Sequence, residues 1–103
     1  MTQRSAFVLR VRPNKIDAYI DAHRNVWPEM LQALRDAGVR NYTIFRAGNE
    51  MFGYFEADDL ERTASDLERQ EVNARWQDTM AQLLEKRVPD TGPPRLEEIF
   101  RLD

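Results

Sequence analysis

Arg40–Glu56, with the sequence RNYTIFRAGNEMFGYFE, gives the clearest strand pattern in this chain. Its two halves, Arg40–Phe45 and Met51–Glu56, are rich in aromatic and β-branched residues, which are enriched in strands. They flank residues 47–50, AGNE, a short connection with a glycine that favours an antiparallel hairpin. The sequence therefore predicts two adjacent antiparallel strands in the middle of the chain.

The segment before this hairpin has a helical pattern. Apolar and aromatic side chains recur there at spacings of three and four residues, at Ile16, Tyr19, Ile20, His23, Trp27, Met30, Leu31 and Leu34. Pro28 interrupts the stripe, because proline is tolerated in the first turn of a helix but removes an interior hydrogen bond. We therefore expect two helical pieces, roughly residues 14–24 and 28–37, with Gly38 in a left-handed conformation after the second.

The segment after the hairpin repeats the helical pattern. Asp58 or Asp59 is placed to cap a short helix that runs through about Leu67. A further helix carries an apolar stripe of Val72, Trp76, Met80, Leu83 and Leu84. The prolines and the glycine between residues 89 and 94 then predict a loop.

A strand at each end completes the pattern, over about residues 5–11 and over Leu96–Leu102. The order β-α-β-β-α-β predicts one α+β domain over residues 1–103, ferredoxin-like, with a four-stranded antiparallel sheet and helices on one face. Apolar side chains occur on both faces of the strands, so we expect a second copy to cover the other face, as in a dimeric α+β barrel. Scattered apolar residues on a solvated face are the alternative.

Length, charge and composition argue against several classes of protein. Among 103 residues there is no cysteine and one histidine, so we expect no disulfide and no metal site. The net charge is -3, with 15 basic residues spread among 18 acidic ones, which argues against a nucleic-acid partner. The four glycines are isolated, so no nucleotide cofactor is expected. No apolar run approaches the roughly 20 residues of a membrane span, and we expect a cytoplasmic protein.

His23 is the first candidate for chemistry. An imidazole exchanges protons around neutrality, and Tyr19 and Trp27 lie one turn before and after it on the same helical face. Tyr42 and Trp76 add aromatic faces with directional hydrogen-bond donors, a combination that suits a sugar ring. For all of these residues, an ordinary place in the hydrophobic core is the alternative interpretation.

Several stretches along the chain form one wider pattern. They are Ala6–Val11 followed by Pro13, Tyr19 with His23 and then Trp27-Pro28-Glu29, Asn41-Tyr42, Arg75-Trp76 with Met80, Pro89-Asp90, and Leu96–Phe100. This pattern resembles the L-rhamnose mutarotases, also described as rhamnose 1-epimerases, nearly from end to end. The spacing from the tyrosine to the histidine to the Trp-Pro pair is its most specific part.

The resemblance implies a dimeric ferredoxin-like enzyme that interconverts the α and β anomers of L-rhamnose by acid/base-catalysed ring opening, without metal or cofactor. It implies that His23 is the proton donor and that Tyr19, Tyr42, Trp76 and Gln77 contact the monosaccharide. Better known members look to have two adjacent tryptophans where this chain has Trp76-Gln77. A mutarotase for another 6-deoxy sugar, such as L-fucose, stays open, as do a non-catalytic ligand-binding module and a small oxygenase.

Overall fold

Three antiparallel strands form the sheet in the computed structural model, which describes residues 1–103. They are β1 (Gln3–Arg10), β2 (Arg40–Ala47) and β3 (Glu50–Ala57), in the spatial order β1-β3-β2. β2 and β3 form the predicted hairpin. Gly48 in its two-residue turn has a φ of 61°, a left-handed conformation that glycine adopts without steric cost.

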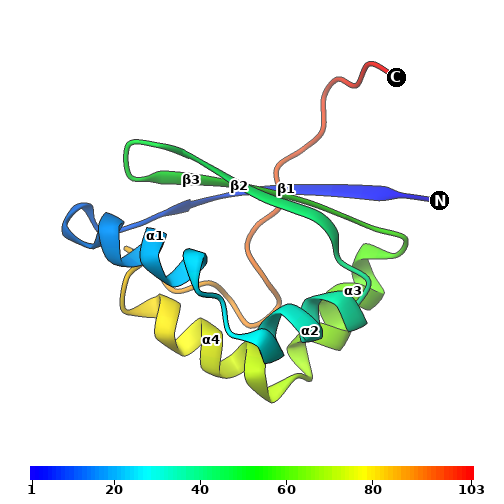
Figure 1. Ribbon diagram of the computed structural model, residues 1–103. Coiled ribbons are helices and arrows are strands. Elements are labelled where there is room, and N and C mark those ends of the chain that lie inside the picture. Colours follow the sequence, from blue (N-terminus) through cyan, green and yellow to red (C-terminus); the bar gives the residue numbers. More distant parts are fainter.

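Four α-helices lie together on one face of the sheet (Figure 1). They are α1 (Ile16–Arg24), preceded by a 3-10 turn over Pro13–Lys15, α2 (Pro28–Asp36), α3 (Leu60–Glu68) and α4 (Glu71–Ala81). Pro28 begins α2, as predicted, and the side chain of Asp59 caps α3 by accepting from the Arg62 N–H at 3.1 Å. None of these helices has the length and apolar character needed to cross a membrane.

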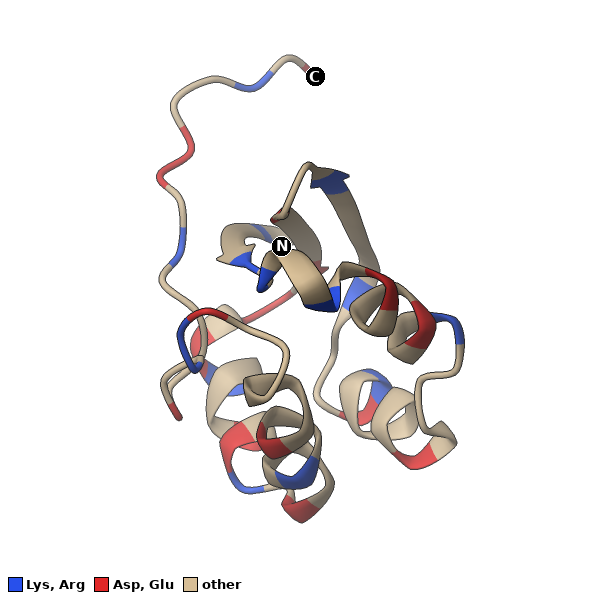
Figure 2. Ribbon diagram, turned by 90° about the vertical axis from the view of Figure 1, so that its left-hand side faces the viewer, with Lys and Arg blue, Asp and Glu red and all other residues tan.

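Charged side chains are spread over the helices and the C-terminal tail without segregation by sign. Figure 2 shows basic and acidic residues alternating along the ribbon. Many of them form exposed pairs, such as Arg24 with Asp21 and Arg87 with Asp78. In this view neither sign is gathered on one part of the ribbon.

Buried apolar side chains connect the sheet to α1, α2 and α4. The cluster consists of Val11, Tyr19, Met30, Met51, Trp76, Met80, Leu84 and Val88. Tyr19 and Trp76 therefore belong to the core as well as to the set of candidate site residues. The hydrophobic core and the lining of the candidate site thus have these two side chains in common.

Phe7 on β1 lies over Gly53, its register partner on β3. A Cβ atom on Gly53 would collide with the outer edge of the Phe7 ring. The Phe7 ring also packs edge-on against Tyr42 of β2, with ring centroids 6.2 Å apart and planes at 83°. The missing side chain at Gly53 thus lets one aromatic ring cross β3 and support another on β2.

β2 has a bulge next to Tyr42. The pairing of β2 with β3 changes register between Arg40 and Thr43. Asn41, inside the bulge, has a φ of 52°, and asparagine adopts this left-handed conformation more readily than most residues. Its Nδ2 also donates to Oε1 of Glu56 at 2.9 Å. Tyr42 lies within the same register change and shares the helix side of the sheet with Ile44, two residues further on.

The expected closing strand over residues 96–102 is absent, so the prediction of a four-stranded sheet is wrong for this structure. Only the start of that segment lies along β1. Arg95 forms a bridge with Phe7, and the Leu96 N–H donates to the Ala6 carbonyl oxygen at 2.7 Å. Figure 1 shows the tail then running away from the sheet.

Glu98 keeps a side-chain contact with β1. Antiparallel pairing that sets Arg95 opposite Phe7 sets Glu98 opposite Arg4, and the Arg4 guanidinium donates to Oε1 of Glu98 at 2.6 and 2.9 Å. No backbone hydrogen bond to β1 follows that of Leu96, although β1 continues to Gln3. Large apolar side chains stay exposed beyond this point, at Ile99, Phe100 and Leu102.

The face of the sheet without helices exposes a row of apolar side chains. Val8, Phe52 and Phe45 are register partners across β1, β3 and β2. Phe45 is 66% exposed and Phe52 37%. The predicted alternation is confirmed, because Tyr42 and Ile44 lie on the helix side.

Gly53→Ala should reduce the free energy of unfolding by about 1–3 kcal/mol, because the new methyl group must displace the Phe7 ring. Urea unfolding measures the loss. In the Phe7→Leu background the same change should cost less, since the shorter side chain vacates the space. Equal costs in the two backgrounds would refute this account of the contact.

Candidate functional site

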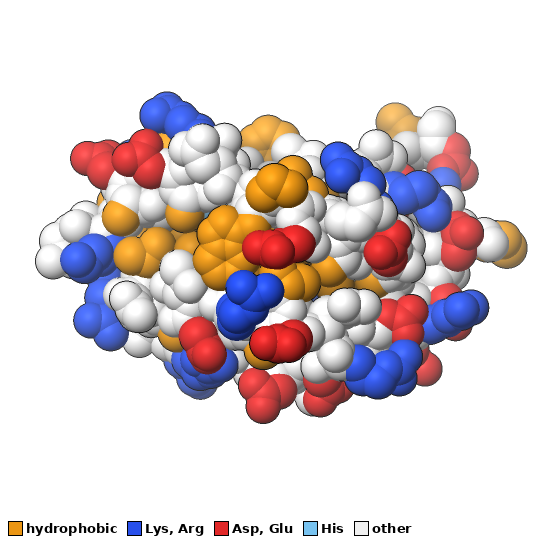
Figure 3. Space-filling view, turned by 60° about the horizontal axis from the view of Figure 1, so that its bottom comes forward, with side chains coloured by type: hydrophobic (Ala, Val, Ile, Leu, Met, Phe, Trp, Pro, Cys, Tyr) orange, Lys and Arg blue, Asp and Glu red, His pale blue; other side chains and the backbone are white.

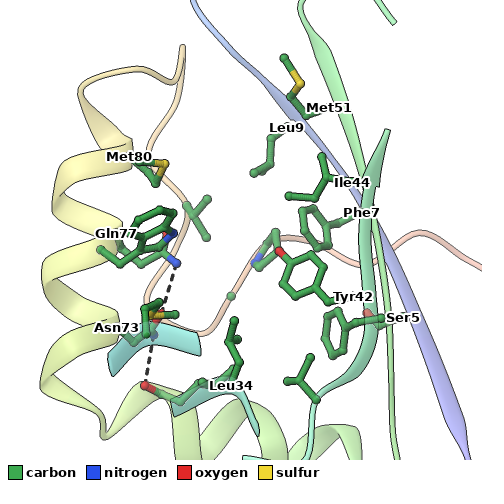
Figure 4. Close-up of a pocket in the computed structure, with 18 of the residues that line it drawn as sticks. Ser5, Phe7, Leu9, Leu34, Tyr42, Ile44, Met51, Asn73, Gln77 and Met80 are labelled. Atoms are coloured by element: carbon green, nitrogen blue, oxygen red, sulfur yellow. Dashed lines mark hydrogen bonds between the residues drawn. The ribbon is translucent and has the colours of Figure 1, made fainter. Parts of the chain in front are cut away.

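A cavity of about 640 Å³ lies between the inner face of the sheet and the helices. Figure 4 shows Phe7, Tyr42 and Ile44 of the sheet on one side of it, and Gln77 and Met80 of α4 on the other. On the helix-bearing side of the molecule, hydrophobic side chains gather at the centre and charged ones surround them (Figure 3). The volume and the largely apolar lining are typical of small-molecule sites.

All five residues singled out from the sequence line this cavity: Tyr19 and His23 from α1, Tyr42 from β2, and Trp76 and Gln77 from α4. Trp27, one turn after His23, is not part of the lining. It packs edge-on against Trp76 instead, with ring centroids 5.1 Å apart. Its contribution is to hold Trp76 in place.

His23 lies in the last turn of α1 between two aromatic rings. The Tyr19 ring is 4.2 Å away between centroids and tilted by 32°, and the Trp76 ring meets the imidazole edge-on at 5.5 Å. Since Trp27 supports Trp76 from behind, the imidazole has little freedom to change its position. A cluster from α1 and α4 thus orients the only histidine of the chain.

The backbone determines which nitrogen of His23 is free. Nδ1 lies 2.9 Å from the carbonyl oxygen of Tyr19. A carbonyl oxygen only accepts, so Nδ1 carries the hydrogen and donates it. Burial lowers the pKa of His23 from 6.5, and the hydrogen bond to the Tyr19 carbonyl opposes that shift in part. At neutral pH the imidazole is therefore mostly neutral, with Nε2 as a proton acceptor.

The two tyrosines of the site stay protonated. Burial raises the pKa of Tyr19 to about 12. Burial also raises the pKa of Tyr42, and the neighbouring Tyr19 adds to the shift. Tyr42 keeps 41% of its surface accessible, yet its hydroxyl points into the cavity, where solvation is poor (Figure 4). Both phenols thus keep their hydrogen at neutral pH, can donate it in a hydrogen bond, and are weaker acids than a free tyrosine.

Sequence reasoning missed two parts of the lining. Asn73 lies one turn before Gln77 and accepts a hydrogen bond from its Nε2 at 3.3 Å. The spacing of two amides four residues apart on a helix was an available signal. Residues 88–93 also line the cavity. Their proline and glycine content predicts a loop, but composition gives no position for it in space.

The arrangement suits proton transfer on a small polar ring. Nε2 of His23 accepts a proton, the phenols donate hydrogen bonds, and the ring faces of Tyr19 and Trp76 offer apolar surface. No group of three or more histidine, cysteine, aspartate or glutamate side chains is placed to hold a metal ion. The chemistry that these residues support is acid/base exchange between oxygens of a bound molecule.

Comparison with known proteins identifies the family of this site. A family model described as L-rhamnose mutarotase matches residues 4–102. The L-rhamnose mutarotase of Oceanobacillus iheyensis is 33% identical over 104 residues, which cover 98% of this chain and 99% of that protein.

Solved structures agree with this result. The crystal structure of the L-rhamnose mutarotase from Formosa agariphila is 32% identical, has a TM-score of 0.80, and is matched over 98% of this chain and 99% of that one. A dimeric ferredoxin-like protein from an uncultured marine organism, 18% identical with a TM-score of 0.57 over 98% of this chain, confirms the ferredoxin-like α+β fold. From the full-length match and the shared fold, we conclude that this chain belongs to the L-rhamnose mutarotase family.

Proposed function

We propose that this chain interconverts the α and β anomers of L-rhamnose and that His23 carries the proton. The observation that supports this most directly is a partly buried imidazole, oriented by the Tyr19 carbonyl, in a cavity of about 640 Å³. The substrate follows from family membership. An L-fucose mutarotase, a non-catalytic binding module and an oxygenase are not favoured, because the relatives are named L-rhamnose mutarotases.

The proton balance of the reaction fits one imidazole. Opening the ring breaks the bond between C1 and the ring oxygen, removes the proton of the anomeric hydroxyl and adds a proton to the ring oxygen. Neutral Nε2 of His23 accepts the first proton, and the imidazolium so formed delivers it to the ring oxygen. Rotation about C1–C2 and closure by the reverse steps gives the other anomer.

His23 therefore first takes a proton from the anomeric hydroxyl of the substrate and then donates it to the ring oxygen. No electron and no group other than the proton is transferred, so the reaction itself calls for no cofactor. Tyr19 and Tyr42 donate hydrogen bonds to sugar oxygens, and Trp76 offers a ring face and an indole N–H. Ile44 and Met80 provide apolar contacts for the 6-methyl group.

Two copies of the chain are proposed to associate through the face of the sheet without helices. The row formed by Val8, Phe52 and Phe45 leaves aromatic surface exposed to water. The apolar tail residues Ile99 and Phe100 add unpaired surface next to the same sheet. A symmetric contact with a second copy covers both the apolar row on the sheet and the apolar residues of the tail. The cytoplasmic location stays a prediction from the sequence.

His23→Asn should slow anomer exchange of L-rhamnose by on the order of 100-fold or more, the usual scale for losing an acid/base group. The asparagine amide can still donate to the Tyr19 carbonyl, so the melting temperature should change little. Saturation-transfer NMR of the anomeric protons, with chelator present, measures the rate. The control is Asn25→Ala, an exposed position outside the cavity. A folded His23→Asn protein with the wild-type rate would remove His23 from the mechanism.

The pH profile should show that the reactive resting form is the neutral imidazole. Because the pKa of His23 is lowered from 6.5, kcat/KM should be level from about pH 7 to 9 and fall at acid pH below 6.5. The same shift destabilises the fold at acid pH, so rates are taken per folded molecule by circular dichroism. A catalysed rate that rises from pH 7 to 5, after subtraction of the buffer rate, would show instead that the imidazolium initiates the reaction.

Phe45→Glu should convert a dimer into a folded monomer at micromolar concentration, because the charge would lie in the contact between the two sheets. Sedimentation velocity measures the mass. The matched control is Ala18→Glu on the exposed side of α1, which should stay dimeric. A monomeric wild-type protein would contradict the proposed assembly.

A further inference from the structure

Two amide side chains on α4 form a short chain of hydrogen bonds beside the cavity. Nδ2 of Asn73 donates to the carbonyl oxygen of Leu67, at the end of α3, at 3.1 Å. Nε2 of Gln77 donates to Oδ1 of Asn73 at 3.3 Å. Both side chains line the cavity, and Figure 4 draws the two bonds as dashed lines that run from Gln77 through Asn73.

The Leu67 carbonyl determines the direction of this whole chain. A carbonyl oxygen only accepts, so the NH₂ group of Asn73 must face Leu67 and the oxygen of Asn73 must face Gln77. That oxygen in turn requires the NH₂ group of Gln77. The amide oxygen Oε1 of Gln77 is consequently turned away from Asn73.

Oε1 of Gln77 accepts no hydrogen bond from the protein, since the only bond of this side chain is the one from its Nε2. No buried side-chain nitrogen or oxygen atom in the structure lacks a partner, so Oε1 must remain accessible. Its side chain lines the cavity and is only partly exposed. Oε1 of Gln77 is thus an accessible hydrogen-bond acceptor on a side chain that lines the cavity.

The other polar groups of the cavity leave a role for such an acceptor. Tyr19 and Tyr42 are protonated phenols, each with one hydrogen to donate and an oxygen that can accept, and the indole of Trp76 only donates. The carboxyl groups of Glu68 and Asp90 also line the cavity, but they are titratable groups. His23 offers an acceptor nitrogen, but that nitrogen is occupied with the reacting proton. Gln77 supplies an acceptor that does not titrate, suited to a sugar hydroxyl that takes no part in the reaction.

We infer that Gln77 determines specificity by accepting a hydrogen bond from one non-reacting sugar hydroxyl, and that Asn73 is the positioning residue that aims its amide oxygen at the sugar. The inference rests on the proposed function for the identity of the ligand. It predicts that the effect of Asn73 on sugar affinity passes entirely through Gln77.

A double-mutant cycle tests this coupling. Gln77→Leu should raise both KM and the Kd for L-rhamnose, measured by NMR titration, by about 10-fold with kcat within a factor of two, since one hydrogen bond of the bound sugar is lost. Asn73→Leu should raise both constants by about 3- to 10-fold, because the Gln77 amide is then free to rotate. The double variant should bind no more weakly than Gln77→Leu alone.

A matched control separates positioning from general loosening of the helices. Gln32 donates to Asp36 at 2.8 Å with the same spacing of four residues, on an exposed part of α2 outside the cavity. Gln32→Leu should leave KM and Kd unchanged. If Asn73→Leu weakens binding equally with and without the Gln77 amide, its role is only to join α3 to α4, and the inference is overturned.

Analogues of L-rhamnose with a single hydroxyl methylated locate the contact. Wild type should lose affinity for one of them, and Gln77→Leu should no longer distinguish that analogue from L-rhamnose. If wild type binds L-rhamnose without exchanging its anomers, the proposed function fails while the coupling still stands. If affinity is the same for Gln77→Leu and wild type, the inference fails while the proposed function stands. A wild-type protein that does not bind L-rhamnose overturns both.

Discussion

The contact between the Phe7 ring and Gly53 underlies both the sheet and the site. Where β3 lacks a side chain, the ring of Phe7 extends across it and meets Tyr42 edge-on. The same ring is 4% exposed and forms part of the cavity wall. A side chain at Gly53 would push the ring towards the helices, into space that the cavity occupies. The lack of a side chain at Gly53 therefore affects both the packing of the three strands and the position of the Tyr42 phenol in the site.

The helices pack against the sheet and still leave a cavity between the two layers. They do so with aromatic side chains that support one another: Trp27 holds Trp76, and Trp76 with Tyr19 encloses His23. Rings of this kind keep a fixed position at low cost in side-chain entropy. Backbone carbonyls orient two of the polar groups of the site, that of Tyr19 for the imidazole and that of Leu67 for the amide pair. Orientation by main-chain atoms is robust, because these atoms are already fixed by the helices.

The edge of the sheet and the tail beside it expose apolar side chains. The backbone of the tail pairs with β1 at Arg95 and Leu96 and then separates from it, so that Phe100 and its apolar neighbours remain in water. Phe45 and Phe52 are exposed on the adjoining face. A monomer of this size gains no compensating burial for such residues, which is the physical argument for a second copy.

Sequence patterns alone predicted the elements from β1 to α4 and named five candidate residues that line one cavity. Alternation in the hairpin, the helical stripe and Pro28 predicted the order of strands and helices, because these local patterns follow from the geometry of each element. The five candidate residues came from their chemistry, their helical spacing and their match to a family pattern. Three further points depend on the folded chain: the missing fourth strand, since the backbone of the tail pairs with β1 only at Arg95 and Leu96; the register change at Asn41; and the direction of the Asn73–Gln77 pair. Each of these depends on which atoms meet across elements distant in sequence, and neither periodicity nor composition carries that information.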